Sequence, residues 1–355
     1  MTFYYLFNVN RQSYNQTMKQ TDKEKTDSRL AMQNKDFRQA INFAFDRHAY
    51  AAQTNGEDGA DRILRNTVTP SNFVQIGGKN FGDAVNEKIV NYGTEWSNIN
   101  LNDAQPAFLN ADKAKAEFAK AKESLQAEGV TFPIHLDMLV DQTAKLDVQQ
   151  ASSFKQTVEE TLGSDNIVID VIQLSPDEKD NATFFADTAE QKDYDIDISG
   201  WSGDYSDPKT YLDLLDPESG SQLKNLGLTP GKDNDVKEKI DLSTYKKLLD
   251  AAENEVENTQ ARYEKFAEVQ AWLTDSALFL PVQSGGANPI FRKTVPFTGA
   301  FSFVGHKGDA DNYKYVELQK EPVTAKQYQE LYEKWQKEKA ESNKKAQEDL
   351  AKHVE

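Results

Sequence analysis

The chain has 355 residues, of which 58 are acidic and 41 basic, so its formal net charge at pH 7 is −17. Such an acidic surface repels nucleic-acid phosphates, which excludes nucleic acid as an expected partner, and it suits cationic or zwitterionic small ligands as well as plain solubility. The absence of cysteine excludes disulfides, thiolate metal sites and a lipidated cysteine within this sequence, and the length suffices for two lobes at about 100 to 200 residues each.

The first ten residues predict a strand. Residues 3 to 10 are aromatic and β-prone from the start, which is typical of an interior strand and suggests that a preceding segment is missing. We find no signal peptide and no apolar run near the roughly 20 residues that a membrane helix needs. As written, the chain is therefore expected in the cytoplasm. A polar stretch from Gln16 to Ser28 predicts a surface loop or a short exposed helix.

Two helices are predicted before residue 130. Asn34 or Asp36 can cap the first, whose apolar residues recur at helical spacing as far as Phe45. The second runs from about Ala111 to Glu128 and ends at a glycine. Between them, residues 53–106 are rich in Gly, Asn, Asp and Pro, which predicts a long irregular excursion.

The following segment predicts a βαβ unit. Apolar and polar residues alternate from Ile134 to Val140, a helical pattern covers 145–162, and a second strand is expected over 167–174. A right-handed crossover makes the two strands parallel, so the lobe is expected to be α/β.

A further strand is predicted over 194–200, with Tyr194, Ile196 and Ile198 on one face and Asp195 and Asp197 on the other. Two helical pieces are expected over 241–275, a short strand over 278–282 and a mixed β region to about residue 318. The tail from residue 325 predicts one helix that packs on the body at its front and projects into solvent at its end.

The segment from Tyr194 to Leu215 is the most informative part of the chain. A strand delivers Trp201 to its carboxyl end, glycines allow a tight turn, Asp204 and Tyr205 project from that turn, and Asp207-Pro208 starts a helix. Open α/β sheets bind ligands at such strand ends.

This segment resembles the Trp-x-x-Asp-Tyr-x-Asp/Glu-Pro signature of the dipeptide- and oligopeptide-binding proteins of ABC importers. Asp36-Phe-Arg-Gln-Ala-Ile-Asn-Phe-Ala-Phe-Asp-Arg47 is similar to the Val-Arg-x-Ala-x-x-x-Ala-x-Asp-Arg helix of that family, and residues 3–10 to its Tyr-Tyr-x-x-x-Asn strand. The similarity extends collinearly to about residue 318. The tail resembles the C-terminal extension of streptococcal oligopeptide-binding lipoproteins.

The resemblance implies a periplasmic-binding-protein-like receptor, lipid-anchored or periplasmic in the family, that closes two lobes around a short peptide and delivers it to a membrane permease. We expect residues 1–10 to be a strand or hinge of lobe I, 11–278 the ligand-binding lobe, 279–322 the return to a partial lobe I, and 323–355 a charged helix. Asp204 is expected to anchor the N-terminus of the peptide. The candidate ligand-binding residues are Tyr5, Asn8, Trp201, Ser202, Gly203, Asp204, Tyr205, Gln283 and Ser284.

Other interpretations stay open. Asp204 could merely shape its turn, and Trp201 and Tyr205 could be core residues. We expect Phe184 and Phe185 in the core, with the lining of a side-chain pocket as the alternative, and Arg38, Asp46 and Arg47 in structural roles.

No cofactor is expected, and the four histidines lack metal-ligand spacing. No catalytic motif is visible, so an enzyme is not expected, although an acidic peptidase is the rival from that class. The remaining alternative is a remnant without transport activity that acts as an interaction module or dimerises through the exposed interlobe face.

Overall fold

The computed structural model describes residues 1–285, 291–298 and 316–352. The chain divides into two compact units, Met1–Ser202 with Asp207–Ala287, and Gly203–Ser206 with Asn288–Glu355. The two units are described separately below. No helix among the described residues is both long and apolar enough to cross a membrane.

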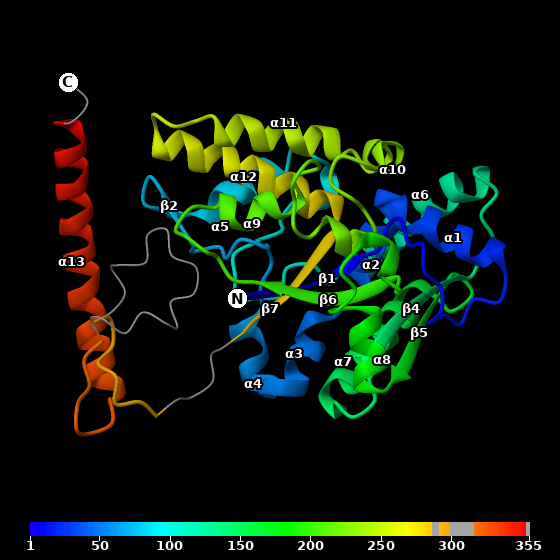
Figure 1. Ribbon diagram of the computed structural model, residues 1–355, viewed down its shortest axis with the longest axis horizontal. Helices are drawn as coiled ribbons and strands as arrows, with labels where there is room; N and C mark the ends of the chain where they lie inside the picture. The colour runs from blue at the N-terminus through cyan, green and yellow to red at the C-terminus, as the bar shows by residue number, and fades with distance from the viewer. Residues whose placement is uncertain (286–290, 299–315, 353–355) are drawn as a thin grey trace. The chain divides into compact units, whose positions relative to one another are not determined.

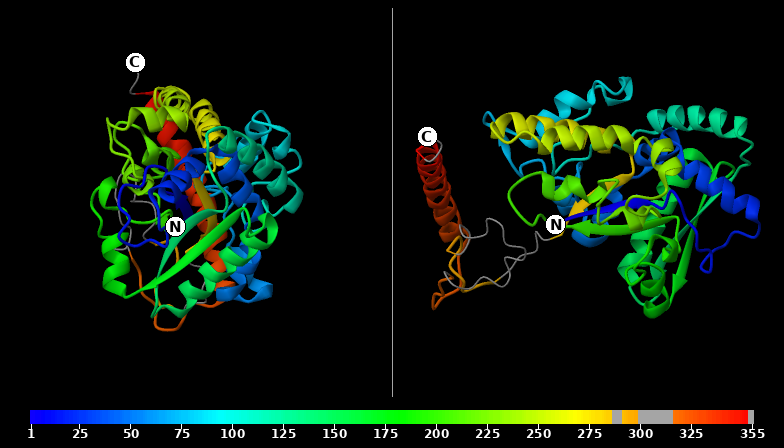
Figure 2. Two further views of the ribbon diagram at one scale, coloured as in Figure 1. Left: turned by 90° about the vertical axis from the view of Figure 1, so that its right-hand side faces the viewer. Right: turned by 45° about the horizontal axis from the view of Figure 1, so that its top comes forward.

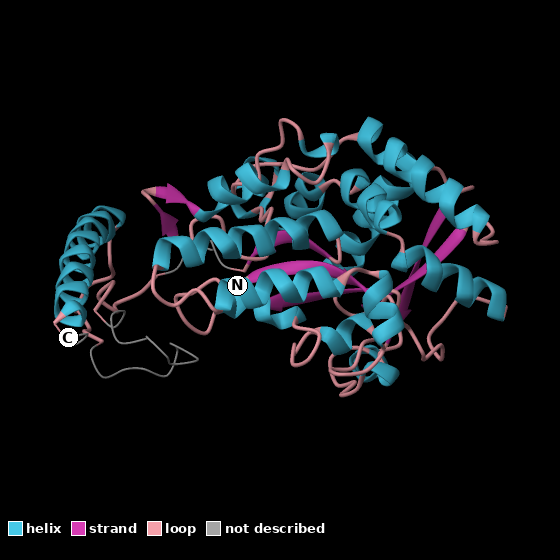
Figure 3. Cartoon of the chain, turned by 90° about the horizontal axis from the view of Figure 1, so that it is seen from above, coloured by secondary structure: helices cyan, strands magenta, loops and turns pink. Residues whose placement is uncertain are grey.

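The larger unit is built on a five-stranded mixed sheet with the order β5-β4-β6-β1-β7. β4 pairs in parallel with β5, whereas β1 runs antiparallel to both β6 and β7. The βαβ prediction is confirmed, because α7 connects β4 to β5. Figure 3 shows the strands lying between helices. The strands are β1 (Thr2–Phe7), β4 (Ile134–Asp141), β5 (Ile167–Leu174), β6 (Ile196–Trp201) and β7 (Phe279–Ser284).

Helices cover the sheet, and α11 and α12 run side by side as the two predicted pieces (Figure 1). The side chain of Asn34 accepts a hydrogen bond from the backbone N–H of Phe37 at 2.9 Å and caps α2, as one of the two expected caps. In the larger unit, the helices of eight or more residues are α1 (Asp22–Gln33), α2 (Lys35–Ala44), α3 (Arg47–Asn55), α5 (Phe81–Ile89), α6 (Ala111–Ala127), α7 (Lys145–Leu162), α11 (Leu242–Glu253) and α12 (Thr259–Ser276).

The expected irregular excursion is only partly irregular. Residues 53–106 contain helices and the two-stranded hairpin β2 (Gln75–Ile76) and β3 (Lys79–Asn80), whose turn is made by Gly77 and Gly78 at positive φ. The prediction was wrong here because each element is too short for a period to emerge. The short helices of the larger unit are α4 (Glu57–Ala60), α8 (Pro176–Ala182), α9 (Lys209–Leu212), α10 (Asn234–Lys239), and the 3-10 turns at 61–63, 94–96, 189–191, 213–215 and 223–226.

A fully buried ion cluster ties the loop after β1 to the sheet. Arg11 contacts the carboxylates of Asp137, Asp193 and Asp195 at 2.6, 2.8 and 3.1 Å, and Lys19 contacts Asp137 at 2.7 Å and also Asp195. With two cations and three carboxylates, almost every charge has an opposite partner, which is the condition under which buried charge is tolerated. Asp195, expected on a polar strand face, is therefore buried.

The smaller unit contains α13 (Ala325–Ala351). The rings of Tyr328, Tyr332 and Trp335 pack around Phe297, with centroids 5.2, 5.7 and 5.2 Å from its own. The front of the helix thus packs on a segment of its own unit, and its second half is exposed. Of the expected mixed β region, only a bridge between Thr294 and Leu318 falls within the described residues.

Candidate functional site

Three strand ends meet at one edge of the sheet. In the strand register Thr2 lies opposite both Trp201 of β6 and Ser284 of β7, and Phe3 lies opposite Gln283. Because β1 is antiparallel to both neighbours, its first residues lie beside the last residues of β6 and β7. Figures 1 and 2 show the N-terminus at this edge. The structure therefore brings the predicted site residue Trp201 together with Gln283 and Ser284, which lie about 80 residues later in the sequence.

On one face of this edge, the close packing of the Phe3 ring requires glycine at positions 200 and 285. A Cβ atom on Gly200 would lie 2.8 Å from the Phe3 ring, and one on Gly285 would lie 2.9 Å from the same ring. No real Cβ atom sits that close to a ring carbon, so Phe3 lies flat across both glycines. Opposite residues of an antiparallel pair share a face, which puts Thr2 and Trp201 on the other side of the sheet.

Two buried polar atoms at this edge have no hydrogen-bond partner within the described residues. They are the hydroxyl oxygen of Thr2, whose residue is fully buried, and the amide oxygen Oε1 of Gln283. Buried polar atoms in folded proteins are nearly always paired with protein groups or water. The edge thus holds unused hydrogen-bonding capacity on two adjacent strands, which a polar ligand or ordered water can take up.

The loop that carries Asp204 is short and held at both ends. At one end Trp201 closes β6, and at the other the guanidinium Nε of Arg262 on α12 contacts the carboxylate of Asp207 at 2.8 Å. The same carboxylate accepts a hydrogen bond from the backbone N–H of Lys209 at 2.9 Å, which starts α9. Asp204 lies three residues from each of these two ends in the sequence.

The structure places Tyr5 and Asn8 apart from this edge. Tyr5 is 4% exposed and packs among aromatic rings, and its hydroxyl donates to that of Tyr50 at 3.5 Å. Asn8 is fully buried, and its side-chain N–H donates to the carbonyl of Lys192 at 3.2 Å. The polar groups of both residues are used inside the lobe. Burial raises the pKa of Tyr5 far above its usual value, helped by Tyr50 and Asp197, so this hydroxyl stays neutral.

β4 and β6 pair only at the start of β6, so the sheet forks along the rest of that strand. β4 and β6 pair at a single position, Met138 with Ile196, and no described strand pairs with Ile198 or Gly200 on the side away from β1. Ile198 is exposed, whereas Tyr194 and Ile196, which were expected on the same face, are buried. Burial also raises the pKa of Asp197, next to Ile198, to about 6, against the opposing charge of Lys179.

An exposed aromatic pair lies near this fork. Phe184 and Phe185 are 75% and 61% exposed, with ring centroids 5.2 Å apart, so the expectation that they are core residues was wrong. The backbone N–H of Phe185 donates to the carbonyl of Asp180 at 2.8 Å, which holds the turn that displays the rings. The turn follows α8, which packs against β4.

The sequence analysis did not identify Thr2 or Phe3 as residues of this edge. It also did not identify the side chains that hold β7 in place. A glycine inside a strand pattern, as at Gly200, was the available signal for close approach of another group. The guanidinium Nε of Arg47 donates to the carbonyl of Pro281 in β7 at 2.6 Å, which confirms a structural role for that arginine. Arg38 likewise donates to the carbonyl of Ser276 at 2.9 Å. Among the described residues, no group of acidic or histidine side chains is arranged to hold a metal ion.

Comparison with known proteins places this geometry in context. The sequence model of the bacterial extracellular solute-binding proteins, family 5, middle region, matches residues 1–222. The chain is 52% identical over 353 residues to the oligopeptide-binding protein AliB of Streptococcus pneumoniae, covering 99% of this chain and 54% of that protein. It is 54% identical to AliA of the same species, covering 98% and 53%. The chain thus spans about half the length of these curated relatives.

Solved structures agree at the level of the fold. The substrate-binding domain of an oligopeptide ABC transporter from Bacillus anthracis aligns with a TM-score of 0.57 and 18% identity, covering 90% of this chain and 49% of that one. OppA of Listeria monocytogenes, solved with a bound peptide, aligns with a TM-score of 0.55 and 19% identity, at the same coverage.

Proposed function

Because the chain belongs to the bacterial extracellular solute-binding proteins of family 5, we propose that it binds short peptides as part of the receptor of an ABC oligopeptide importer. A membrane permease is the partner to which the peptide passes. The observation that carries the proposal is the convergence of the end of β6, the start of β1 and the end of β7, with the segment that bears Asp204 following β6 directly in the chain. Relatives named as oligopeptide-binding proteins support the choice of ligand.

The N-terminus of the peptide is held by Asp204. A charge-assisted hydrogen bond between this carboxylate and an α-ammonium group contributes about 1.5 to 3 kcal/mol once water is excluded. Trp201, Ser202, Gly203 and Tyr205, the neighbours of Asp204 in the sequence, are the other candidates for contact with the peptide. Tyr5 and Asn8 are left out of this contact because their polar groups are occupied inside the lobe.

The peptide backbone extends along β6. Ile198 and Gly200 have β1 on one side and no described strand on the other, so an extended peptide can add there as a strand. Gln283 and Ser284 lie at the same edge, opposite Phe3 and Thr2, and supply polar side chains there. Strand addition reads backbone N–H and C=O groups, which every peptide has, so it tolerates many sequences.

Apolar side chains of the peptide rest on exposed apolar side chains of the larger unit. Ile198 on β6 and the ring pair of Phe184 and Phe185 are exposed and are the candidates for this contact. The rings are held by backbone hydrogen bonds, so they are ready to pack without a large ordering cost.

The test is calorimetric titration of a peptide with a free amino terminus into the chain, the Asp204→Asn variant and a matched Asp165→Asn control. Asp165 is exposed and lies on the turn before β5. We expect the control to bind like the parent and Asp204→Asn to bind at least about tenfold more weakly. Equal binding by all three proteins would refute the anchoring role of Asp204.

A further inference from the structure

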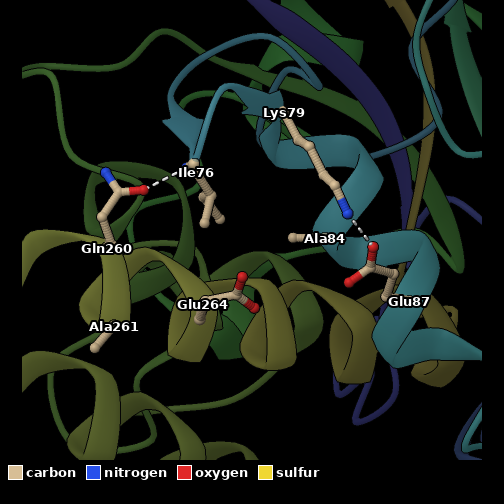
Figure 4. A pocket seen from close by; sticks show the side chains of 8 residues that line it. Ile76, Lys79, Ala84, Glu87, Gln260, Ala261 and Glu264 are labelled. Atoms are coloured by element: carbon tan, nitrogen blue, oxygen red, sulfur yellow. Dashed lines mark hydrogen bonds and ion pairs between the residues drawn. The ribbon is translucent and has the colours of Figure 1, made fainter.

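A groove between α5 and α12 contains two neighbouring hollows, of about 420 and 190 Å³. The larger lies between these helices and the β2–β3 hairpin, as Figure 4 shows. The hairpin is held to α12 by a hydrogen bond from the backbone N–H of Gly77 to the side-chain oxygen of Gln260. The hollow is therefore framed by three connected elements of the larger unit, and its size lies in the range of ligand pockets.

The larger hollow combines an apolar floor with carboxylates. Ile76, Ala84 and Ala261 supply the apolar surface, and Figure 4 shows Glu264 and Glu87 beside it. This arrangement matches a side chain with an aliphatic stem and a cationic end. Lysine and arginine have that shape, because their methylene stems pack on apolar surface while the charge stays at a polar rim.

The groove already holds one ammonium group, from its own chain. The Nζ atom of Lys88 lies 3.3 Å from the carboxylate of Glu264 and 3.4 Å from that of Glu268. Glu264 lines the larger hollow and Glu268 the smaller, so Lys88 lies where the two meet. Burial lowers the pKa of Lys88, but the contacts with Glu264 and Glu268 outweigh it and hold the pKa above its usual value, so Lys88 stays charged. The pair of carboxylates is thus arranged to accept an ammonium group.

The third carboxylate of the groove is only loosely paired. Glu87 contacts Lys79 at 2.9 Å, but the two side chains are 59% and 64% exposed. An ion pair this exposed contributes little and exchanges easily for another cation. Three carboxylates face two lysines across the two hollows, so the groove has an excess of negative charge.

We propose that this groove is a docking site for a lysine- or arginine-bearing loop of a partner protein. The incoming side chain lays its stem on Ile76 and Ala261 and brings its charge to Glu264 and Glu87. The site shares no residue with the strand ends at Trp201, so it operates independently of the peptide-binding function.

The test uses a blocked tripeptide, acetyl-alanyl-lysyl-leucine amide, whose lack of a free amino terminus keeps it from the proposed anchor at Asp204. Binding is followed by amide NMR shifts in the full chain. We expect shifts in 75–92 and 260–268, weakening by about fivefold or more in Glu264→Gln, and no shifts with a norleucine analogue. Lys88→Met removes the competing ammonium group and is expected to strengthen binding about twofold or more.

Three results would overturn the proposal. They are shifts confined to β6 and β7, equal binding of the norleucine analogue, and binding of free lysine as tight as that of the tripeptide, which would indicate a small-molecule site. An opposite response of Glu264→Gln and Lys88→Met separates charge recognition from damage to the fold, because a structural defect would weaken binding in both variants. Glu264→Gln should bind peptides with a free amino terminus as tightly as the parent does. This result keeps the test distinct from that of the peptide site.

Discussion

Replacing Asp137 by asparagine tests whether the buried ion cluster holds the lobe together. Its carboxylate accepts hydrogen bonds from Arg11 at 2.6 Å, from Lys19 and Thr17 at 2.7 Å, and from the backbone N–H of Met18 at 3.1 Å. Asparagine keeps the size of the side chain but replaces one accepting oxygen by an N–H donor. That donor then faces other donors, and two buried cations lose a shared anion.

Breaking a fully buried pair typically costs 3 to 5 kcal/mol, because the remaining charge stays desolvated. We expect Asp137→Asn to lower the free energy of unfolding by about this amount at pH 7, measured by urea denaturation followed by tryptophan fluorescence. The exposed control Asp165→Asn should change it by less than about 0.5 kcal/mol. A loss below about 1 kcal/mol in Asp137→Asn would refute the reasoning.

The stability of the Asp137→Asn variant should also depend on pH differently from that of the parent. Burial alone would raise the pKa of Asp137, but the charges of Lys19 and Arg11 and the hydrogen bonds outweigh burial and hold it below its ordinary 3.8. A lowered carboxyl pKa contributes stability that is present above pH 3.8 and is lost as pH falls through the lower value of the folded state. In Asp137→Asn the loss of stability below pH 4 should therefore be shallower than in the parent.

Three further outcomes are expected. Gly200→Val should lower the melting temperature by thermal denaturation, with a cost of about 1 to 3 kcal/mol, because its side chain would enter the Phe3 ring; an unchanged melting temperature would contradict the packing described here. Phe185→Ser should leave stability unchanged but weaken calorimetric binding of apolar peptides, whereas a large loss of stability would place the ring in the core. Carboxylate hydrogen bonds raise the pKa of His48 to about 9, so its stabilising effect is complete below pH 6.5 and lost as pH rises through 9. His48→Gln should then destabilise the chain at pH 6 but not at pH 10. Equal urea midpoints of the parent and the variant at pH 6 would rule this out.

Local pattern was enough to predict elements whose partners are close in sequence. β4, α7 and β5 follow from two alternating stretches around one helical stretch, and a crossover of this length leaves little choice of pairing. The Trp201 to Asp207 segment was recognisable for a similar reason, because its glycines, carboxylates and proline are contiguous.

Pairing between distant segments was not predictable. Nothing in the pattern of β1 says that it lies between β6 and β7, or that Thr2 meets both Trp201 and Ser284. The burial of Asp195 depends on Arg11 and Lys19, which come from a distant loop. Phe184 and Phe185 were likewise expected in the core because they are apolar, whereas the structure exposes both rings.

The most direct test of the central claim is to map where a peptide with a free amino terminus binds, by hydrogen exchange of the full chain with and without ligand. We predict that protection rises in residues 196–202, 1–4 and 282–285, the three strand ends, and that Asp204→Asn removes this change. Protection that rises only elsewhere, for example in 75–92, would contradict the proposed site.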